Sequence, residues 1–295
     1  MVSHPDFICI GAQKAATTWL YDVLSRTPGI FLPRIKELHY FSELYSVDAK
    51  RFGPKHRAEQ IAHIRSFHQS RNTGSEYERM VLEQLDHIES NKLDDAWYKH
   101  IFSYAHDNEV TGEICPCYMA LPVRGVRHVL SINPLMRILV IVRDPIDRLW
   151  SHMRMHDKSG YMALDADAIL KGRIEMGPYL RYTDYACAIP RWESIAGHGH
   201  VKVMLYDQIQ ENAHDAIDEI NTFIGMRGAK TKADIDRNVF SGTKMTMRPD
   251  LHAKLLEMLM PQYTFLAERF PAQTSLWLER HRTAIESSSH AHSRG

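Results

Sequence analysis

The chain has 295 residues, of which 44% are hydrophobic, so it can build one large α/β domain or two small ones, and we expect one. Its 36 Lys and Arg residues balance 36 Asp and Glu residues, which excludes a global charge that would attract nucleic acid or an anionic membrane. No leader-like segment precedes the first apolar run, and no run approaches the roughly 20 apolar residues that span a bilayer. We therefore expect a soluble cytoplasmic protein whose anion-binding sites, if any, are local.

The cysteines and histidines predict no metal site. Cys115 and Cys117 flank a single proline, without the two-residue gap of a zinc knuckle or redox motif, and the four cysteines show no disulfide framework. His152 and His156 could share a helix face, but no HExxH motif accompanies them. We expect buried or incidental thiols and no bound metal.

The first structural unit joins a buried strand, a turn and an amphipathic helix. Phe7 to Ile10 is a short apolar run followed by Gly11, which predicts a strand that enters a tight turn. A helix is expected to begin near Thr17, because the apolar residues that follow recur at helical spacing. Lys14 in the turn, the free amides of the helix start and the hydroxyls of Thr17 and Thr18 together predict a site for a phosphate or sulfate group.

The next part of the chain changes in character. A loop punctuated by Pro28 and Pro33 leads into the mixed polar and aromatic residues 36–41. From about Leu44 to Asn108 the chain is rich in charge and histidine and poor in strand-like runs, which predicts a mostly helical insertion. Within it Trp97, Ile101 and Tyr104 recur at helical spacing, and we expect them to form one packing face.

A second strand, turn and helix follow. Residues 110–113 are expected to end a strand, and residues 115–118 to form a loop, because Pro116 cannot donate a backbone hydrogen bond. Residues 136–142 are the strongest strand signal in the chain, and we expect them to be central in the sheet. Asp144 stands at an N-cap position before Pro145, which predicts a helix that runs to about His156.

Arg143 and Ser151 place a possible second anion contact on this unit. Arg143 ends the strand, and Ser151 lies about two turns into the helix, on roughly the same side as the helix start. Taken alone, Arg143 would be read as one half of a surface ion pair with Asp144 or Asp147. Its pairing with an independent phosphate-like turn favours the anion contact.

The remaining segments continue the alternation of helices and strands. Helices are expected over 184–196 and around Ile217 to Ile224, where Gly225 stops the helix, with a buried strand over 201–206 between them. A loop over 238–249 carries Lys244 and Arg248, a last helix lies within 251–270, and residues from Ser287 onward read as a disordered tail. The alternation predicts an α/β fold: a single domain with a central parallel sheet flanked by helices.

The turn at 11–18 is not the GxxxxGK[ST] loop of nucleotide triphosphatases. Its lysine comes early, the second glycine is absent, and no obvious acid for magnesium compensates. A metal-dependent ATPase or kinase is therefore disfavoured.

Several blocks in order carry a more specific resemblance. They read GAQKAATTWLYDVL, KELHYF, GEICPCYM, ILVIVRDPIDRLWSH, YTDYACAIPRWESI and VKVMLYDQIQENAHDAIDEINTFIGM. In this order they resemble the sulfotransferases that use 3′-phosphoadenosine 5′-phosphosulfate (PAPS), especially the branch that contains the heparan-sulfate sulfotransferases and many bacterial enzymes. The resemblance spans most of residues 7–226, with the charged middle segment as its main gap. It implies a P-loop-like, three-layer architecture over residues 1–286.

The resemblance also implies roles for individual residues. Lys14, Thr17 and Thr18 match the 5′-phosphosulfate loop, Arg143 and Ser151 match the residues that hold the 3′-phosphate, and Glu37 matches the general base. Lys14 is expected to stabilise charge on the bridging oxygen as the sulfuryl group leaves. The other residues assigned to cofactor binding are Gln13, Ala15, Ala16, Trp19 and Lys244.

The chain departs from the family pattern at several positions. Many relatives have glycine where this chain has Ala15 or Ala16, and alanine disfavours a positive φ. His39 is a second candidate base, with structural packing as its alternative role. Ile114 stands where some carbohydrate-acting relatives carry a lysine, which argues against an acidic sugar as the acceptor.

Two other functions remain open from the sequence. One is a P-loop phosphotransferase that uses ATP, and the other is a non-catalytic nucleotide-binding protein. For a sulfotransferase, the acceptor would be a small molecule or a carbohydrate, with no nucleic acid partner, and neither its identity nor the oligomeric state follows from the sequence.

Overall fold

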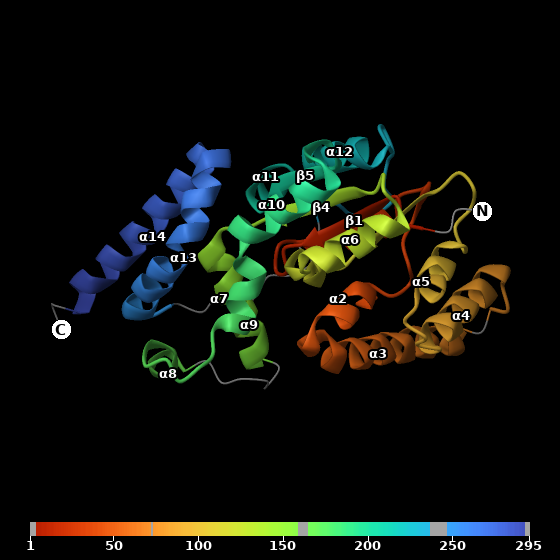
Figure 1. The fold of residues 1–295 in the computed structure, drawn as a ribbon, viewed down its shortest axis with the longest axis horizontal. Coiled ribbons are helices and arrows are strands. Elements are labelled where there is room, and N and C mark those ends of the chain that lie inside the picture. Colours follow the sequence, from red (N-terminus) through yellow and green to blue (C-terminus); the bar gives the residue numbers. More distant parts are fainter. Residues whose placement is uncertain (1–3, 72, 159–164, 237–246, 293–295) are drawn as a thin grey trace.

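The computed structural model describes residues 4–71, 73–158, 165–236 and 247–292. Within these residues five parallel strands form a sheet in the order β2-β3-β1-β4-β5 (Figure 1). The strands are β1 (Phe7–Gly11), β2 (Ile30–Phe31), β3 (Val110–Ile114), β4 (Arg137–Val142) and β5 (Val201–Leu205). The α/β class with a parallel sheet is therefore confirmed.

The strand order places β1 in the middle of the sheet. The chain continues from β1 to β2 and β3 on one side and later adds β4 and β5 on the other. The expectation that residues 136–142 are central needs this correction: β4 is an interior strand, buried from Ile138 onward, but it lies between β1 and β5. Ligands in such sheets bind beyond the carboxyl ends of the strands, where the strand order reverses, and here that position is the end of β1.

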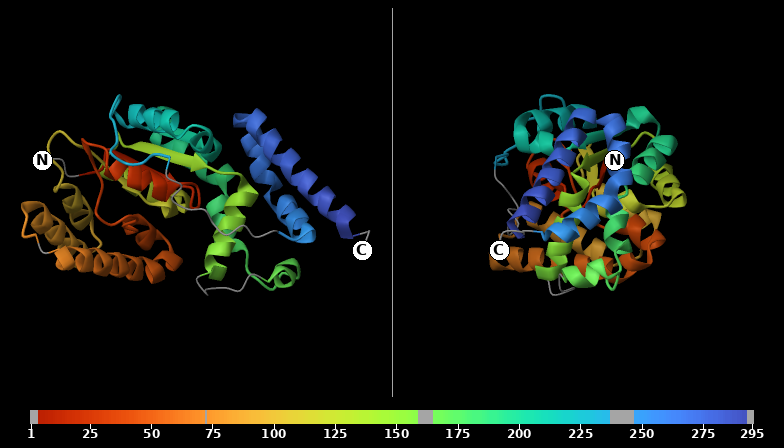
Figure 2. Two further views of the ribbon diagram at one scale, coloured as in Figure 1. Left: turned by 180° about the vertical axis from the view of Figure 1, so that it is seen from behind. Right: turned by 90° about the vertical axis from the view of Figure 1, so that its left-hand side faces the viewer.

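Helices cover both faces of the sheet. The helix α6 (Val123–Ile132) lies in front of the strands in Figure 1, and α1 (Thr17–Ser25) lies in front of them when the molecule is seen from behind in Figure 2. The helices α10 (Tyr185–Ala196), α11 (Tyr206–Glu211) and α12 (Ala213–Ile224) flank β5. Gly225, with φ of 94°, ends α12 as the sequence predicted. This arrangement is the expected layering of helix, sheet and helix.

Four helices lie at one end of the molecule, over the stretch where a helical insertion was expected (Figure 1). They are α2 (Tyr40–Tyr45), α3 (Val47–Arg71), α4 (Glu76–Glu89) and α5 (Asp95–Phe102). Trp97 and Ile101 are buried on α5, but Tyr104 is only half-buried because the helix ends before it.

The segment after β3 differs from the expected loop. Residues Pro116–Ala120 form a 3₁₀ helix, η1, with the proline in its first turn. A proline is tolerated there because the first amides of a helix have no partner within the helix. By contrast, α7 (Pro145–Lys158) begins where the sequence predicted, and the Asp147 amide donates to Asp144 Oδ1 at 3.0 Å.

The C-terminal part contains short helices and a long helical hairpin. The short ones are α8 (Ala166–Leu170), α9 (Gly177–Leu180), η2 (Arg181–Thr183) and η3 (His198–His200). The hairpin consists of α13 (Pro249–Arg269) and α14 (Pro271–His292), which lie side by side in both figures. Among the described helices, none is both long and apolar enough to cross a membrane.

The sequence analysis missed α14. It expected one last helix within 251–270 and a disordered tail from Ser287, whereas helical backbone continues to His292. The buried stripe of α14 consists of Thr274, Trp277 and His281, so two of its three members are polar. A search for apolar residues at helical spacing cannot detect such a stripe.

Candidate active site

The carboxyl ends of β1, β3 and β4 lie at one edge of the sheet, because these strands are parallel neighbours. Residues 12–16 follow β1, η1 follows β3, and Arg143 with Asp144 follows β4. The first two segments approach each other closely at Gly11, where a Cβ atom would lie 3.3 Å from the Pro116 carbonyl oxygen. The two turns that carry Lys14 and Arg143 therefore leave the sheet at the expected edge, and η1 lies beside the first of them.

The turn between β1 and α1 is shaped to receive an anion. Lys14 and Ala16 both have a left-handed backbone, with φ of 70° and 58°. Ala16 is the N-cap of α1 and offers no side-chain cap, so the first amides of the helix stay available to a ligand. Thr17 is buried and Thr18 half-buried at this helix start.

Arg143 is tied directly to this turn. Its Nη1 donates to the Lys14 carbonyl at 2.8 Å, and its guanidinium lies 4.8 Å from the centre of the Tyr206 ring. The Lys14 ammonium lies 3.7 Å from Met155 Sδ on α7, and Ser151 is half-buried one turn earlier on the same helix. The structure thus brings Lys14 and Arg143 together and places the helix that carries Ser151 beside them.

Positive charge is crowded around Lys14. Burial lowers the pKa of its ammonium, and the neighbouring charges of Arg143, Arg154 and Arg148 lower it further. A bound polyanion would relieve this repulsion. The donor set therefore fits a ligand with phosphate groups.

The other residues assigned to cofactor binding have varied environments. Gln13 has a buried Oε1 with no hydrogen-bond partner among the described residues. Ala15 is buried, and Trp19 lies in the core with its indole N–H donating to the Ile235 carbonyl at 2.9 Å, so only the backbone of Trp19 can serve a ligand as a donor. Lys244 lies outside the described residues.

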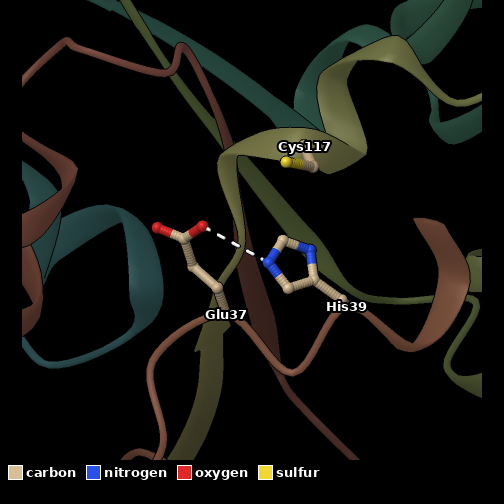
Figure 3. Close-up of side chains that lie close together, drawn as sticks. All are labelled: Glu37, His39 and Cys117. Carbon is tan, nitrogen blue, oxygen red and sulfur yellow. Dashed lines mark ion pairs between the residues drawn. The ribbon is translucent and has the colours of Figure 1, made fainter. Parts of the chain in front are cut away.

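Glu37 and His39 lie on the segment between β2 and α2 and face each other (Figure 3). Both have a left-handed backbone, with φ of 65° and 61°, and His39 Nε2 lies 3.6 Å from Glu37 Oε2. Burial raises the pKa of Glu37, but the charge of Lys36, which pairs with Oε1, and the contact with His39 bring it below its usual value. Burial lowers the pKa of His39 to about 3. At neutral pH the pair is therefore a carboxylate beside an uncharged imidazole.

Two residues that the sequence analysis did not assign to the site hold this segment in place. The Leu38 amide donates to Glu113 Oε1 at 3.2 Å, and the Leu38 carbonyl accepts from Arg57 Nη1 at 2.7 Å. Glu113 belongs to the GEICPCYM block, so the sequence analysis could have assigned it to the site. Arg57 lies in the insertion and is buried, but nothing in the sequence pattern separated it from the surface arginines of the same segment.

A sequence-family profile described as "Sulfotransferase family" matches residues 5–229. The chain belongs to the sulfotransferase family.

Curated relatives of this sulfotransferase include Carbohydrate sulfotransferase 15 of Homo sapiens and of Rattus norvegicus. The human protein is 26% identical over 155 residues and the rat protein 25%, and each match covers 50% of this chain. The matched region amounts to 26% of the length of either relative.

Solved structures of sulfotransferases share the fold. A sulfotransferase from Alicyclobacillus acidocaldarius superposes with a TM-score of 0.64 at 20% identity and covers 94% of this chain and 99% of its own. The sulfotransferase domain of the Synechococcus PCC 7002 olefin synthase gives a TM-score of 0.54 at 16% identity, with 89% and 94% covered. The fold of these two sulfotransferases is thus shared along nearly the whole chain.

Proposed function

We propose that this sulfotransferase moves a sulfuryl group from PAPS to a hydroxyl or amine of an acceptor. The observation that carries the proposal is the hydrogen bond between Arg143 and the Lys14 carbonyl, which joins two basic positions at the carboxyl edge of the sheet. PAPS has a phosphosulfate at its 5′ position and a phosphate at its 3′ position. Two adjacent anion-binding positions are what such a donor requires.

We assign the 5′ group to the start of α1. The first amides of this helix and the hydroxyls of Thr17 and Thr18 would bind the phosphosulfate, and Lys14 would neutralise charge on the bridging oxygen. Arg143 and Ser151 would bind the 3′-phosphate. The contact of Arg143 with Tyr206 supports this role, because it fixes the guanidinium before a ligand arrives.

Glu37 is the proposed general base. It is held as a carboxylate by Lys36 and is 18% exposed, whereas His39 is 1–2% exposed and uncharged at neutral pH. A carboxylate can accept a proton from an acceptor hydroxyl as the oxygen attacks. His39 remains the second candidate and would support Glu37 through the contact of its Nε2.

The reaction needs alignment and charge neutralisation, with no covalent intermediate on the protein. The acceptor oxygen forms a bond to sulfur while the bond from sulfur to the bridging phosphate oxygen breaks. Glu37 takes the acceptor proton, and Lys14 balances the charge that develops on the leaving phosphate. In this proposal Glu37 and Lys14 act on opposite sides of the sulfuryl group that is transferred.

For the acceptor we propose a carbohydrate or a small-molecule alcohol. The similarity to Carbohydrate sulfotransferase 15 supports the carbohydrate class. Ile114, which follows Glu113 on β3, supplies no positive charge at the position where some carbohydrate-acting relatives have a lysine. This difference favours a neutral acceptor over an acidic one.

A thermal-shift comparison separates this function from its alternatives. The product nucleotide PAP should raise the Tm more than AMP does, because only PAP carries the 3′-phosphate. A larger shift with magnesium-ATP would support a phosphotransferase instead. Transfer of label from ³⁵S-labelled PAPS to a panel of neutral sugars and alcohols then tests catalysis, and PAP binding without any transfer would favour a non-catalytic protein.

A further inference from the structure

Three side chains with metal-ligating atoms surround the proposed base. They are Glu37, His39 and Cys117, and one ligating atom of each lies within 4.8 Å of those of the other two (Figure 3). A carboxylate, an imidazole and a thiol are the ordinary ligands of Zn²⁺ in proteins. Zinc bonds of about 2.0–2.3 Å in tetrahedral geometry place ligand atoms roughly 3.3–3.8 Å apart. The 3.6 Å between Glu37 Oε2 and His39 Nε2 already falls in that range.

The surroundings of His39 orient the correct nitrogen. Its Nδ1 lies 3.2 Å from Ser42 Oγ and 3.7 Å from Cys115 Sγ. Its Nε2 therefore faces Glu37, as Figure 3 shows. Histidines that bind metals usually engage their second nitrogen in an outer contact of this kind, which fixes the ring.

The other two ligands are also held in place. Lys36 pairs with Glu37 Oε1 and leaves Oε2 directed at His39. Cys117 lies on η1 with its side chain buried. The cluster thus has three donors. Two of them, His39 and Cys117, are buried, and the third, Glu37, is partly exposed, so an ion can reach the cluster from the side of Glu37.

We propose that Glu37, His39 and Cys117 form a Zn²⁺-binding site and that zinc bound there inhibits sulfuryl transfer. On binding, the Cys117 thiol releases its proton to solvent and sulfur bonds to zinc, while Glu37 and His39 donate electron pairs without losing protons. Soft sulfur and imidazole ligands favour Zn²⁺ over Mg²⁺ or Ca²⁺. The inhibition rests on the proposed function of Glu37, because zinc would occupy the carboxylate oxygen that accepts the acceptor proton.

The sequence analysis expected no metal because it compared ligand spacing along the chain. Cys115 and Cys117 do not form a zinc motif with each other. The fold instead brings Cys117 of η1 beside the segment after β2, and this long-range pairing has no signature in local spacing.

Cobalt spectroscopy on the full chain tests the site without nucleotide or acceptor. Co²⁺ should produce a thiolate-to-metal absorption band that one equivalent of Zn²⁺ abolishes. Cys117→Ser should lose this band and bind Zn²⁺ at least about tenfold more weakly, since it removes one of three ligands. Cys187→Ser, which changes the exposed cysteine of α10, should keep both properties. Absence of the band in the natural chain, or its persistence in Cys117→Ser, would overturn the proposal.

Two further measurements keep the result interpretable. Circular dichroism melting checks that Cys117→Ser is folded, and Cys117→Ala provides a second variant that keeps an apolar side chain in the same place. Label transfer from PAPS, measured relative to the metal-free rate of each variant, should be inhibited by zinc in the natural chain and in Cys187→Ser only, and chelation should restore it. Zinc binding that depends on Cys117 but leaves transfer unaffected would refute the inhibitory role. The cobalt result stands apart from the proposed function, because it requires no transfer.

Discussion

Ala16 holds a backbone conformation that costs an alanine free energy. Its φ of 58° lies in the left-handed region, where a Cβ atom crowds the following carbonyl at a cost of about 1–2 kcal/mol. Glycine avoids this cost but loses about 0.5–1 kcal/mol through its freedom in the unfolded chain. We therefore predict that Ala16→Gly raises the free energy of unfolding by roughly 0.5–1 kcal/mol in urea titrations.

Ala15 supplies the matched control. Ala15 is fully buried, and its φ is not positive, so glycine relieves no strain there. Ala15→Gly should therefore lower the free energy of unfolding by about 1 kcal/mol. Equal destabilisation by both substitutions would mean that the turn stores no strain at Ala16.

Glu37→Gln tests the proposed base. The amide keeps the shape of the side chain but cannot accept the acceptor proton, so we predict that kcat falls by about 10²–10⁴. The Tm should change little, because Glu37 is partly exposed. Glu59→Gln on α3, at a side chain that is 67% exposed, is the control. If Glu37→Gln kept the kcat of the natural chain, Glu37 would not be the base and another group would have to accept the proton.

The residue types at this site were predictable, but their conformations were not. Lys14, Arg143 and Glu37 stood out because charged side chains follow apolar runs or a recognisable block. The left-handed backbone at Glu37 has no signal in residue type, and at His39 the only signal is the general enrichment of histidine in this uncommon conformation. Such conformations persist because the surrounding contacts hold them, and those contacts are long-range.

At the scale of elements, the segment from Lys36 to His39 is held from two sides. β3 supplies Glu113 to the Leu38 amide, and α3 supplies Arg57 to the Leu38 carbonyl. The helical insertion therefore positions the segment that carries the proposed base, Glu37. The sequence predicted the helices of this insertion, but a helical pattern does not say which buried arginine reaches back to a loop.

Glu113 should make the stability of the protein depend on pH. Burial raises the pKa of Glu113 from its ordinary value of 4.5 to about 7, even though Tyr98 and Tyr118 donate hydrogen bonds to the carboxylate. The unfolded chain therefore loses this proton first as pH rises, and stability contributed by Glu113 falls between pH 4.5 and about 7.

Urea titrations of the natural chain and Glu113→Gln at pH 5 and pH 8 measure this effect. We predict that the free energy of unfolding of the natural chain, relative to the variant, is larger at pH 5 than at pH 8. The comparison cancels the titration of other groups. A difference that is constant with pH would mean that Glu113 is ionised throughout the range.

The turn between β4 and α7 should set the preference for a 3′-phosphate. Hydrogen bonds to charged groups contribute about 1.5–3 kcal/mol, so Arg143→Ala should weaken PAP binding roughly tenfold to a hundredfold. AMP, which lacks the 3′-phosphate, should lose much less affinity. Arg137→Ala changes the arginine at the opposite end of β4, and calorimetry should find its PAP affinity unchanged. Equal losses for PAP and AMP would mean that Arg143 acts only through the Lys14 turn.

At the scale of the whole molecule, the hairpin of α13 and α14 docks onto the residue next to Arg143. Asp144 is 2% exposed, and its carboxylate accepts from the Tyr263 hydroxyl at 3.0 Å and contacts His281 Nε2 at 2.9 Å. Arg280 adds a contact with Asp144 at 3.1 Å. The family profile ends at residue 229, so these three partners come from beyond the matched region.

This docking explains why the end of the chain was the part of the fold least accessible to prediction. α14 is specified by polar side chains that meet a buried carboxylate far away in the sequence. The periodic apolar pattern that revealed β4 and α12 has no counterpart there. The same contacts imply that the hairpin supports the turn of the proposed nucleotide site as well as the core.

His281→Asn tests that implication. The shorter side chain should leave the buried Asp144 carboxylate short of a partner, which costs about 1–3 kcal/mol in the free energy of unfolding. Because Asp144 caps α7 and adjoins Arg143, we also predict weaker PAP binding by calorimetry at a temperature where the variant is fully folded. Arg282→Ala, at an exposed position of α14, should change neither property. Lower stability with unchanged PAP affinity would mean that the hairpin covers the core without positioning the Arg143 turn.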